Sequence, residues 1–108
     1  MAARLLCDVL PGLAEELELL FEQAERPDLA RQLPSLRVRS RCSCGDDFCA
    51  TLYTGGGKPA DSIDLEPSEG IITVELDGDE RIVGIEILYR DDYREAIDNL
   101  FQKKSESP

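Results

Sequence analysis

The spacing of apolar residues in the first third of the chain predicts helices. Between Gly12 and Glu25, apolar residues recur at the interval of one helical face: Leu13, Leu17, Leu20, Phe21 and Ala24. Pro27 ends this helix, because the residue before a proline disfavours helical backbone, and can open a second one. We therefore expect a long amphipathic helix over residues 12–25 and a short helix over residues 28–33, closed by Pro34.

After residue 35, apolar and polar residues alternate, so the period of the pattern becomes two. Leu36, Val38 and Ser40 alternate with three arginines, Arg37, Arg39 and Arg41. This alternation is typical of a half-exposed strand, in which the arginines share the face opposite the core. A tight turn at residues 45–47 then leads to a second strand over 48–54, and a short strand is expected over 62–65.

The strongest local signal is a hairpin. β-rich runs over residues 71–76 and 81–89 flank Asp77 and Gly78, a dipeptide that favours hairpin turns. The second run is apolar on both faces, so it is expected to be a central strand. Glu86 interrupts this run, and an outward-facing carboxylate is the preferred interpretation over a buried one paired with Arg81, Arg90 or a first-strand arginine.

A last helix is expected over residues 92–103, capped by Asp91. Its apolar stripe consists of Tyr93, Ile97, Leu100 and Phe101. These elements predict an α+β fold: an antiparallel sheet of four to five strands, with the N-terminal and C-terminal helices packed on one face. Residues 1–104 form a single domain in this interpretation, and residues 105–108 form a disordered tail.

The net charge of the chain limits the classes of partner that we expect. The chain has 12 Lys and Arg against 23 Asp and Glu, a formal net charge of −11. Because this excess repels a phosphate backbone, nucleic-acid binding is not expected. No apolar stretch approaches membrane-spanning length and no signal peptide is visible, so we expect a cytoplasmic protein that does not enter a membrane.

The absence of histidine removes several kinds of chemistry. A chain with no His cannot use a Ser-His-Asp or Cys-His arrangement, and it offers no imidazole to a metal. The carboxylates at residues 46–47 and 77–80 lack the spacing of a calcium loop and suit ordinary turns. We therefore predict no catalytic residues, and a domain that is more simply explained as non-enzymatic.

Three of the four cysteines are close together. Cys42, Cys44 and Cys49 surround the predicted turn, which is how zinc knuckles present thiolates. A fourth ligand could come from Asp46, Asp47, Cys7 or a second subunit. Buried thiols and a thiol-based redox role, with Cys44 or Cys49 as the reactive group, are the alternatives to zinc. The cofactor prediction is accordingly none or zinc.

The pairing register of the first hairpin separates these alternatives. If Cys44 faces Phe48, then Cys42, Cys44, Phe48, Ala50 and Leu52 share the core face and Cys49 lies on the other side with the arginines. If Gly45 faces Phe48, the three clustered cysteines share a face, and Leu52 moves to the side of the arginines. Burial of apolar residues favours the first register.

The hairpin segment also carries a resemblance. The core of this hairpin reads Val-Glu-Leu-Asp-Gly-Asp-Glu-Arg-Ile-Val-Gly-Ile-Glu-Ile-Leu. It resembles the closing hairpin of a bacterial and archaeal family of small domains of unknown function, which ends in a Val-Gly-Ile-Glu-Ile-Leu strand. The Cys-Gly-Asp-Asp-Phe-Cys-Ala-Thr-Leu-Tyr-Thr segment looks like one in short uncharacterised bacterial proteins. The resemblance implies a bacterial origin and an α+β fold, without a known activity.

Taken together, these observations predict a small acidic domain that acts through protein contacts. The expected contact surface is the exposed face of the first hairpin, with Arg37, Arg39 and Arg41 as a local positive patch and Tyr53 as an aromatic neighbour. The alternative is that these arginines pair with carboxylates of the chain itself and contribute little. The oligomeric state does not follow from the sequence.

Overall fold

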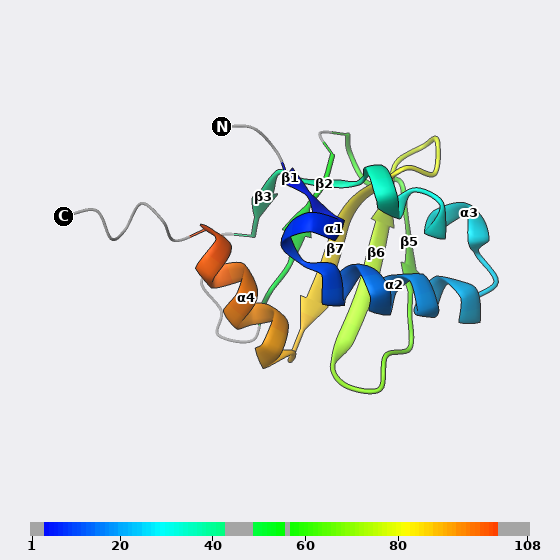
Figure 1. Cartoon of the computed structure of the whole chain (residues 1–108). Helices are drawn as coiled ribbons and strands as arrows, with labels where there is room; N and C mark the ends of the chain where they lie inside the picture. The colour runs from blue at the N-terminus through cyan, green and yellow to red at the C-terminus, as the bar shows by residue number, and fades with distance from the viewer. Residues whose placement is uncertain (1–3, 43–48, 56, 102–108) are drawn as a thin grey trace.

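The computed structural model describes residues 4–42, 49–55 and 57–101, with helices near both ends of the chain and most of the strands between them (Figure 1). The helices are α1 (Leu6–Val9), α2 (Pro11–Gln23), α3 (Pro27–Ala30), the 3₁₀ helix η1 (Leu33–Ser35) and α4 (Asp91–Phe101). The strands are β1 (Arg4–Leu5), β2 (Arg37–Val38), β3 (Ser40–Arg41), β4 (Leu52–Tyr53), β5 (Asp61–Asp64), β6 (Ile71–Leu76) and β7 (Ile82–Leu88). The predicted tail over residues 105–108 lies outside the described residues.

The two long helices correspond to the predicted ones, and the short helix differs. The helix expected over residues 28–33 is divided into α3 and η1, and Pro34 lies inside η1. A proline is tolerated in the first turn of a helix, because its missing N–H would have no partner there. The expectation that Pro34 closes a helix is therefore wrong.

Five strands form one antiparallel sheet in the order β3-β4-β7-β6-β5, and β1 and β2 form a separate two-stranded sheet. This architecture confirms the α+β class. The central position of β7 is also confirmed, since Ile85 pairs with Leu52 of β4 on one side and with Val74 of β6 on the other. An apolar strand suits this position because both of its faces are buried, as the low exposure of Val83 shows.

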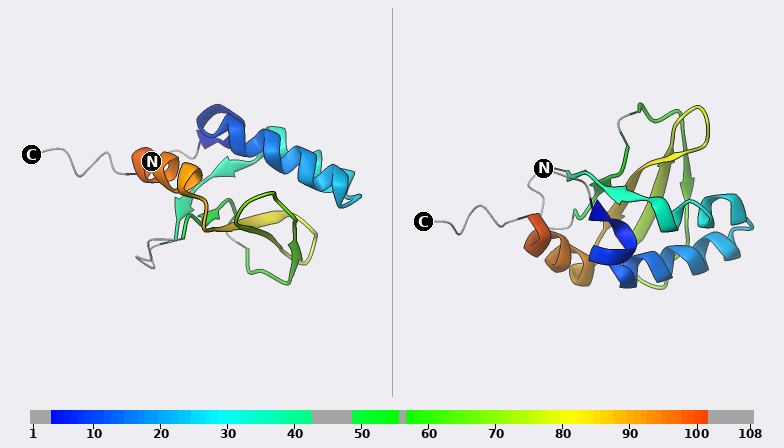
Figure 2. Two further views of the ribbon diagram at one scale, coloured as in Figure 1. Left: turned by 90° about the horizontal axis from the view of Figure 1, so that it is seen from below. Right: turned by 45° about the horizontal axis from the view of Figure 1, so that its top comes forward.

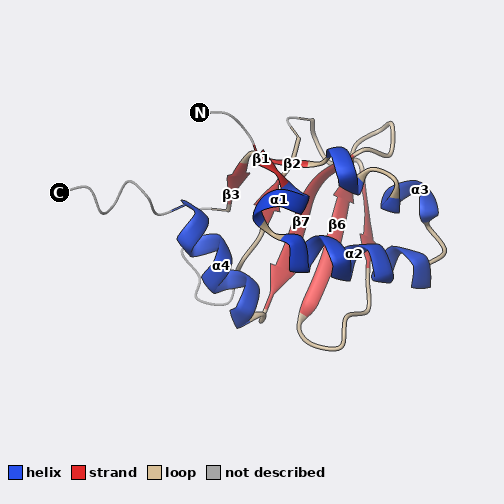
Figure 3. Ribbon diagram, viewed as in Figure 1, coloured by secondary structure: helices blue, strands red, loops and turns tan. Residues whose placement is uncertain are grey.

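Helices α1, α2 and α4 lie on one side of the five-stranded sheet (Figures 2 and 3). Strand β6 alternates accordingly, with Ile72, Val74 and Leu76 buried against the helices. The largest fully buried side chains in this layer include Leu6, Leu13, Leu17, Phe21, Leu52, Ile85, Ile87 and Ile97. Each such burial stabilises the fold by about 1.5–3 kcal/mol. We call the opposite side of the sheet, which no described helix covers, the helix-free face.

The strand expected over residues 36–41 is interrupted. Val38 belongs to β2 in the small sheet, whereas Ser40 belongs to β3 in the large one. Between them, the Arg39 N–H donates to the Tyr53 carbonyl at 2.9 Å, and Ser40 also faces Tyr53. Two residues opposite one constitute a β-bulge, which reverses the alternation of the strand.

The bulge decides the register of the first hairpin. Arg41 faces Leu52, as expected when Gly45 faces Phe48, so the preferred register is wrong. The burial argument assumed one unbroken strand. Because the bulge reverses the alternation, Val38 and Leu52 both reach the core, while Arg41 is carried to the helix-covered side. The turn itself, residues 45–47, lies outside the described residues.

The second hairpin is held at its turn and anchored to the helical layer. The Asp77 carboxylate accepts hydrogen bonds from the N–H groups of Asp79 at 2.8 Å and Arg81 at 3.0 Å. These backbone donors, that of Arg81 foremost, lower the pKa of Asp77. The Gln32 side chain donates to the Glu80 carbonyl at 2.8 Å and accepts from the Ile82 N–H at 2.9 Å, which joins the turn to the α3–η1 segment.

Within the described part of the chain, no helix combines the length and the apolar character needed to cross a membrane.

Candidate functional site

Cys42, Cys49 and Tyr53 lie together on the helix-free face. Cys42 donates its backbone N–H to the Thr51 carbonyl at 2.9 Å, so it follows Arg41 on the opposite side of the strand. Cys49 precedes buried Ala50 and points away from the core with Thr51, to whose hydroxyl its Sγ donates at 3.4 Å. The structure thus brings two of the three clustered cysteines to one face, where Tyr53 accompanies them.

These side chains differ in access to solvent. Cys49 is buried, Cys42 is half-buried, and the Tyr53 side chain is 37% exposed. Burial is the main cause that raises the pKa of Tyr53, and the neighbouring Cys42 raises it further. The phenol therefore stays protonated at neutral pH and can donate a hydrogen bond to a bound partner.

The proposed metal ligands are described only in part. Cys44, Asp46 and Asp47 lie outside the described residues. In the part of the chain that is described, no three side chains of the metal-binding types come together. Cys7, one of the candidates for a fourth ligand, lies in α1 with its Sγ 3.6 Å from the Leu33 carbonyl. Because the helical layer and the helix-free face are separated by the sheet, Cys7 does not complete a site with Cys42 and Cys49.

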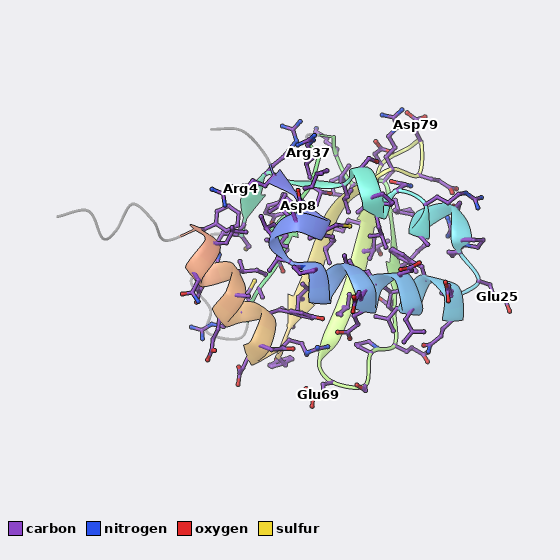
Figure 4. The ribbon with its side chains drawn as sticks, viewed as in Figure 1. Arg4, Asp8, Glu25, Arg37, Glu69 and Asp79 are labelled. Atoms are coloured by element: carbon purple, nitrogen blue, oxygen red, sulfur yellow. The ribbon has the colours of Figure 1, made fainter. Side chains whose placement is uncertain are left out.

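The three arginines of the expected contact surface are separated. Arg37 and Arg39 are exposed, and Figure 4 shows Arg37 on the small sheet near Arg4. Arg41 instead forms an ion pair with Asp98 of α4 and donates to the carbonyls of Cys42 and Cys49. The expectation that all three project from one strand face is wrong, because the bulge at Arg39 and Ser40 turns Arg41 toward the helices.

A second polar cluster joins α2, α4 and the β5–β6 connection, and the sequence did not reveal it. The Arg90 guanidinium makes two hydrogen bonds with the Glu16 carboxylate, both 2.9 Å long, and two with Asp92. It also donates to the Glu69 carbonyl at 3.2 Å and lies 4.5 Å from the centroid of the Tyr93 ring. The Tyr93 hydroxyl in turn donates to Glu16.

Arg90 is almost completely buried in this cluster, with 8% of its surface exposed. Its hydrogen bonds lower the pKa values of Glu16 and Asp92, and Glu16 and Asp92 raise the pKa of Arg90. Because the guanidinium donates hydrogen bonds to Glu16 of α2, Asp92 of α4 and the Glu69 carbonyl, the cluster links the two helices and the β5–β6 connection. The one local sign of it was a basic residue directly before Asp91 and Asp92.

Glu86 faces Thr73 on the helix-free face and is half-buried. Two of the arginines considered as its partners are engaged elsewhere, Arg90 with Glu16 and Arg41 with Asp98. The preferred outward orientation agrees with this position.

The described residues thus place two thiols and an exposed phenol on the helix-free face, with Arg39 next to Tyr53 of the neighbouring strand and Arg37 on the small sheet. Such groups suit contact with a protein or, through the thiols, a metal ion. Comparisons of the chain with protein-family models, with curated proteins and with solved structures found no match.

Proposed function

We propose that the chain is a protein-interaction domain that acts without catalysis and uses a contact surface around Arg37, Arg39 and Tyr53. The observation that carries this proposal is the β-bulge. It sets two consecutive exposed residues, Arg39 and Ser40, against Tyr53 on the neighbouring strand. Arginine and tyrosine are enriched among the residues that dominate binding energy at protein interfaces.

The charge of this surface indicates the kind of partner. Arg37 and Arg39 are separated by two positions, or roughly 7 Å along an extended chain, which is within the Debye length of about 8 Å at physiological ionic strength. They form a local positive region on a protein of net charge −11. An acidic segment of a partner fits this region, and the Tyr53 ring adds an apolar contact.

A photo-crosslinking amino acid at position 53, in cells that naturally express the protein, identifies the partner. The affinity of the purified pair is then measured for Arg39→Glu and Tyr53→Ala, with Arg31→Glu as the matched control at an exposed site on the end of α3. We expect at least about tenfold weaker binding for the first two, equivalent to about 1.4 kcal/mol, and unchanged binding for the control. Unchanged affinity in both variants, or loss of folding alongside loss of binding, contradicts the proposal.

A second candidate function is zinc binding through Cys42, Cys44 and Cys49. The observed register favours it, because it is the one that places Cys42 and Cys49 on the same face. Elemental analysis of protein purified without chelator tests it, with Cys42→Ser expected to lose the metal and Cys7→Ser to keep it. Less than about a tenth of an equivalent of zinc in the wild type contradicts this candidate, since structural zinc binds tightly.

A further inference from the structure

We propose that the outer face of α2 binds a basic amphipathic helix of a partner protein. This surface lies on the side of the sheet that the helices cover (Figure 1). Tyr53 lies on the helix-free face, because it follows the core residue Leu52 in β4, so the two surfaces are distinct. We call it the α2 surface. It comprises the exposed side chains of α2, together with a hollow on one side of the helix and a groove on the other.

Apart from Pro11 and Gln23 at its two ends, the exposed side chains of α2 are three carboxylates and one leucine. Glu15, Glu18, Leu19 and Glu22 are all exposed, and their spacing places them on one helical face. Leu19 is 54% exposed, which is unusual in an otherwise well-buried set of leucines on the same helix. The Leu19 side chain offers an apolar contact at the centre of this surface. The surrounding carboxylates attract a cationic partner and repel an anionic one.

The hollow lies between α2 and the α3–η1 segment and has a volume of about 280 Å³. Its walls are mostly apolar and are formed by Cys7, Pro11, Ala14, Ala30, Leu33 and Pro34. Glu15 and Glu18 also line it. Pockets for whole small molecules begin at about 300 Å³, so a hollow of this size suits an apolar side chain presented by a peptide.

The groove lies on the other side of α2 and has a volume of about 620 Å³. It is bordered by Leu19 and Gln23 of α2 and by Glu66 and Pro67 of the β5–β6 connection. Arg90 is the one cation among its lining residues, and it is neutralised by Glu16 and Asp92. The ionised groups left to meet a ligand here are therefore carboxylates.

These features fit a helix with lysines or arginines on one side and leucine-like residues on the other. Its basic side chains would meet Glu15, Glu18 and Glu22, while its apolar side chains would contact Leu19 and enter the hollow. An amphipathic helix that lays its apolar side against a groove is a recurring mode of recognition. Because the carboxylates are exposed, salt is expected to weaken the complex.

Fluorescence anisotropy with labelled synthetic peptides tests the proposal. The probe is a peptide of about 18 residues, long enough to form a helix, with leucines on one side and lysines on the other. A scrambled peptide of the same composition and a peptide with glutamates in place of lysines are the peptide controls. We expect the amphipathic basic peptide to bind about tenfold or more tightly than either control.

Protein variants then locate the site. Glu15→Lys combined with Glu18→Lys is expected to weaken binding of the basic peptide by about tenfold or more. Glu69→Lys combined with Asp79→Lys makes the same change in net charge at exposed sites outside the α2 surface (Figure 4). This control is expected to bind within about twofold of the wild type. Glu15→Gln with Glu18→Gln provides a milder variant, and thermal unfolding of each protein confirms that it is folded.

If the two pairs of lysine substitutions weaken peptide binding equally, the peptide is attracted by net charge alone, and the proposal is overturned. Binding of the scrambled peptide as tight as that of the amphipathic one would also overturn it. Arg39→Glu and Tyr53→Ala should leave peptide binding unchanged, so failure at the α2 surface is distinguishable from failure of the proposed function. Self-association of the chain, seen by sedimentation and abolished by the Glu15 and Glu18 variant, would assign the surface to a second copy instead.

Discussion

The guanidinium of Arg90 and the carboxylate of Glu16 form a bidentate ion pair, in which both nitrogen–oxygen distances are 2.9 Å. The pair joins the residue before α4 to the middle of α2. The two residues are 74 positions apart in the chain. Arg90 lies between the end of β7 at Leu88 and the start of α4 at Asp91, so this pair links the central strand and the C-terminal helix to α2.

Replacing Arg90 should strongly destabilise the fold. Arg90→Met keeps the length of the side chain but leaves the partly buried Glu16 carboxylate without its cation. We expect a loss of about 2–4 kcal/mol in the free energy of unfolding, measured by urea denaturation. Arg31→Met, at an exposed position, is the control and should change stability by less than about 0.5 kcal/mol. A similar small effect for both variants would mean that the pair contributes little.

The same pair should make stability sensitive to acid. Hydrogen bonds from Arg90 lower the pKa of Glu16 below its ordinary value of 4.5, despite the opposing effect of burial. A carboxylate with a lowered pKa in the folded state stabilises the protein above the unfolded pKa, and this contribution is lost as the pH falls through the folded value. We expect the urea midpoint of the wild type to fall more steeply below about pH 5 than that of Glu16→Gln.

The comparison of wild type with Glu16→Gln cancels the effects of the many other carboxylates. Both proteins lose the self-repulsion of an acidic surface as they are protonated, so only the difference between them reports on Glu16. Parallel pH curves from pH 7 to pH 3 would contradict this prediction.

Gly70 should not tolerate a side chain. Its φ is +71°, and a Cβ built there would lie 2.6 Å from both the Arg90 Cγ and the Leu88 carbonyl oxygen. Gly70→Ala therefore combines backbone strain with a clash at the Arg90 cluster, and we expect a loss of about 2 kcal/mol or more. Gly78→Ala, where a Cβ meets no atom within 4 Å, is the control with an expected effect below about 0.5 kcal/mol. Thermal unfolding of the two variants side by side tests this difference.

The cysteines should react with a thiol reagent in a definite order. Among the three cysteines that the structure describes, Cys7 is exposed, Cys42 is half-buried and Cys49 is buried. Of these three, alkylation followed by mass spectrometry should label Cys7 first and Cys49 last. Urea should bring their rates together, because unfolding removes the protection. Faster labelling of Cys49 than of Cys7 in the native protein would contradict the described burial. It would favour the redox role considered for these thiols, since a reactive thiolate needs a lowered pKa and access.

Local periodicity was enough to predict much of this fold. The two long helices, the hairpin of β6 and β7, and the central position of β7 all follow from apolar spacing and turn chemistry within a few residues. These signals are reliable because a helical face or a strand face is defined by neighbours three, four or two positions away. The antiparallel sheet with helices on one side follows from the same elements, since each must bury its apolar face.

The candidate site depended on contacts between distant segments. Alternation over residues 36–41 predicted one strand, but the bulge opposite Tyr53 arises where the chain passes from the small sheet to the large one. This bulge places Cys42 and Cys49 on the same face of the sheet and turns Arg41 toward Asp98. The residues near Arg90 in the sequence did not indicate that it would pair with Glu16 either. Contacts between segments that are far apart in the chain depend on the packing of the whole chain, and the spacing of residues along one segment does not specify them.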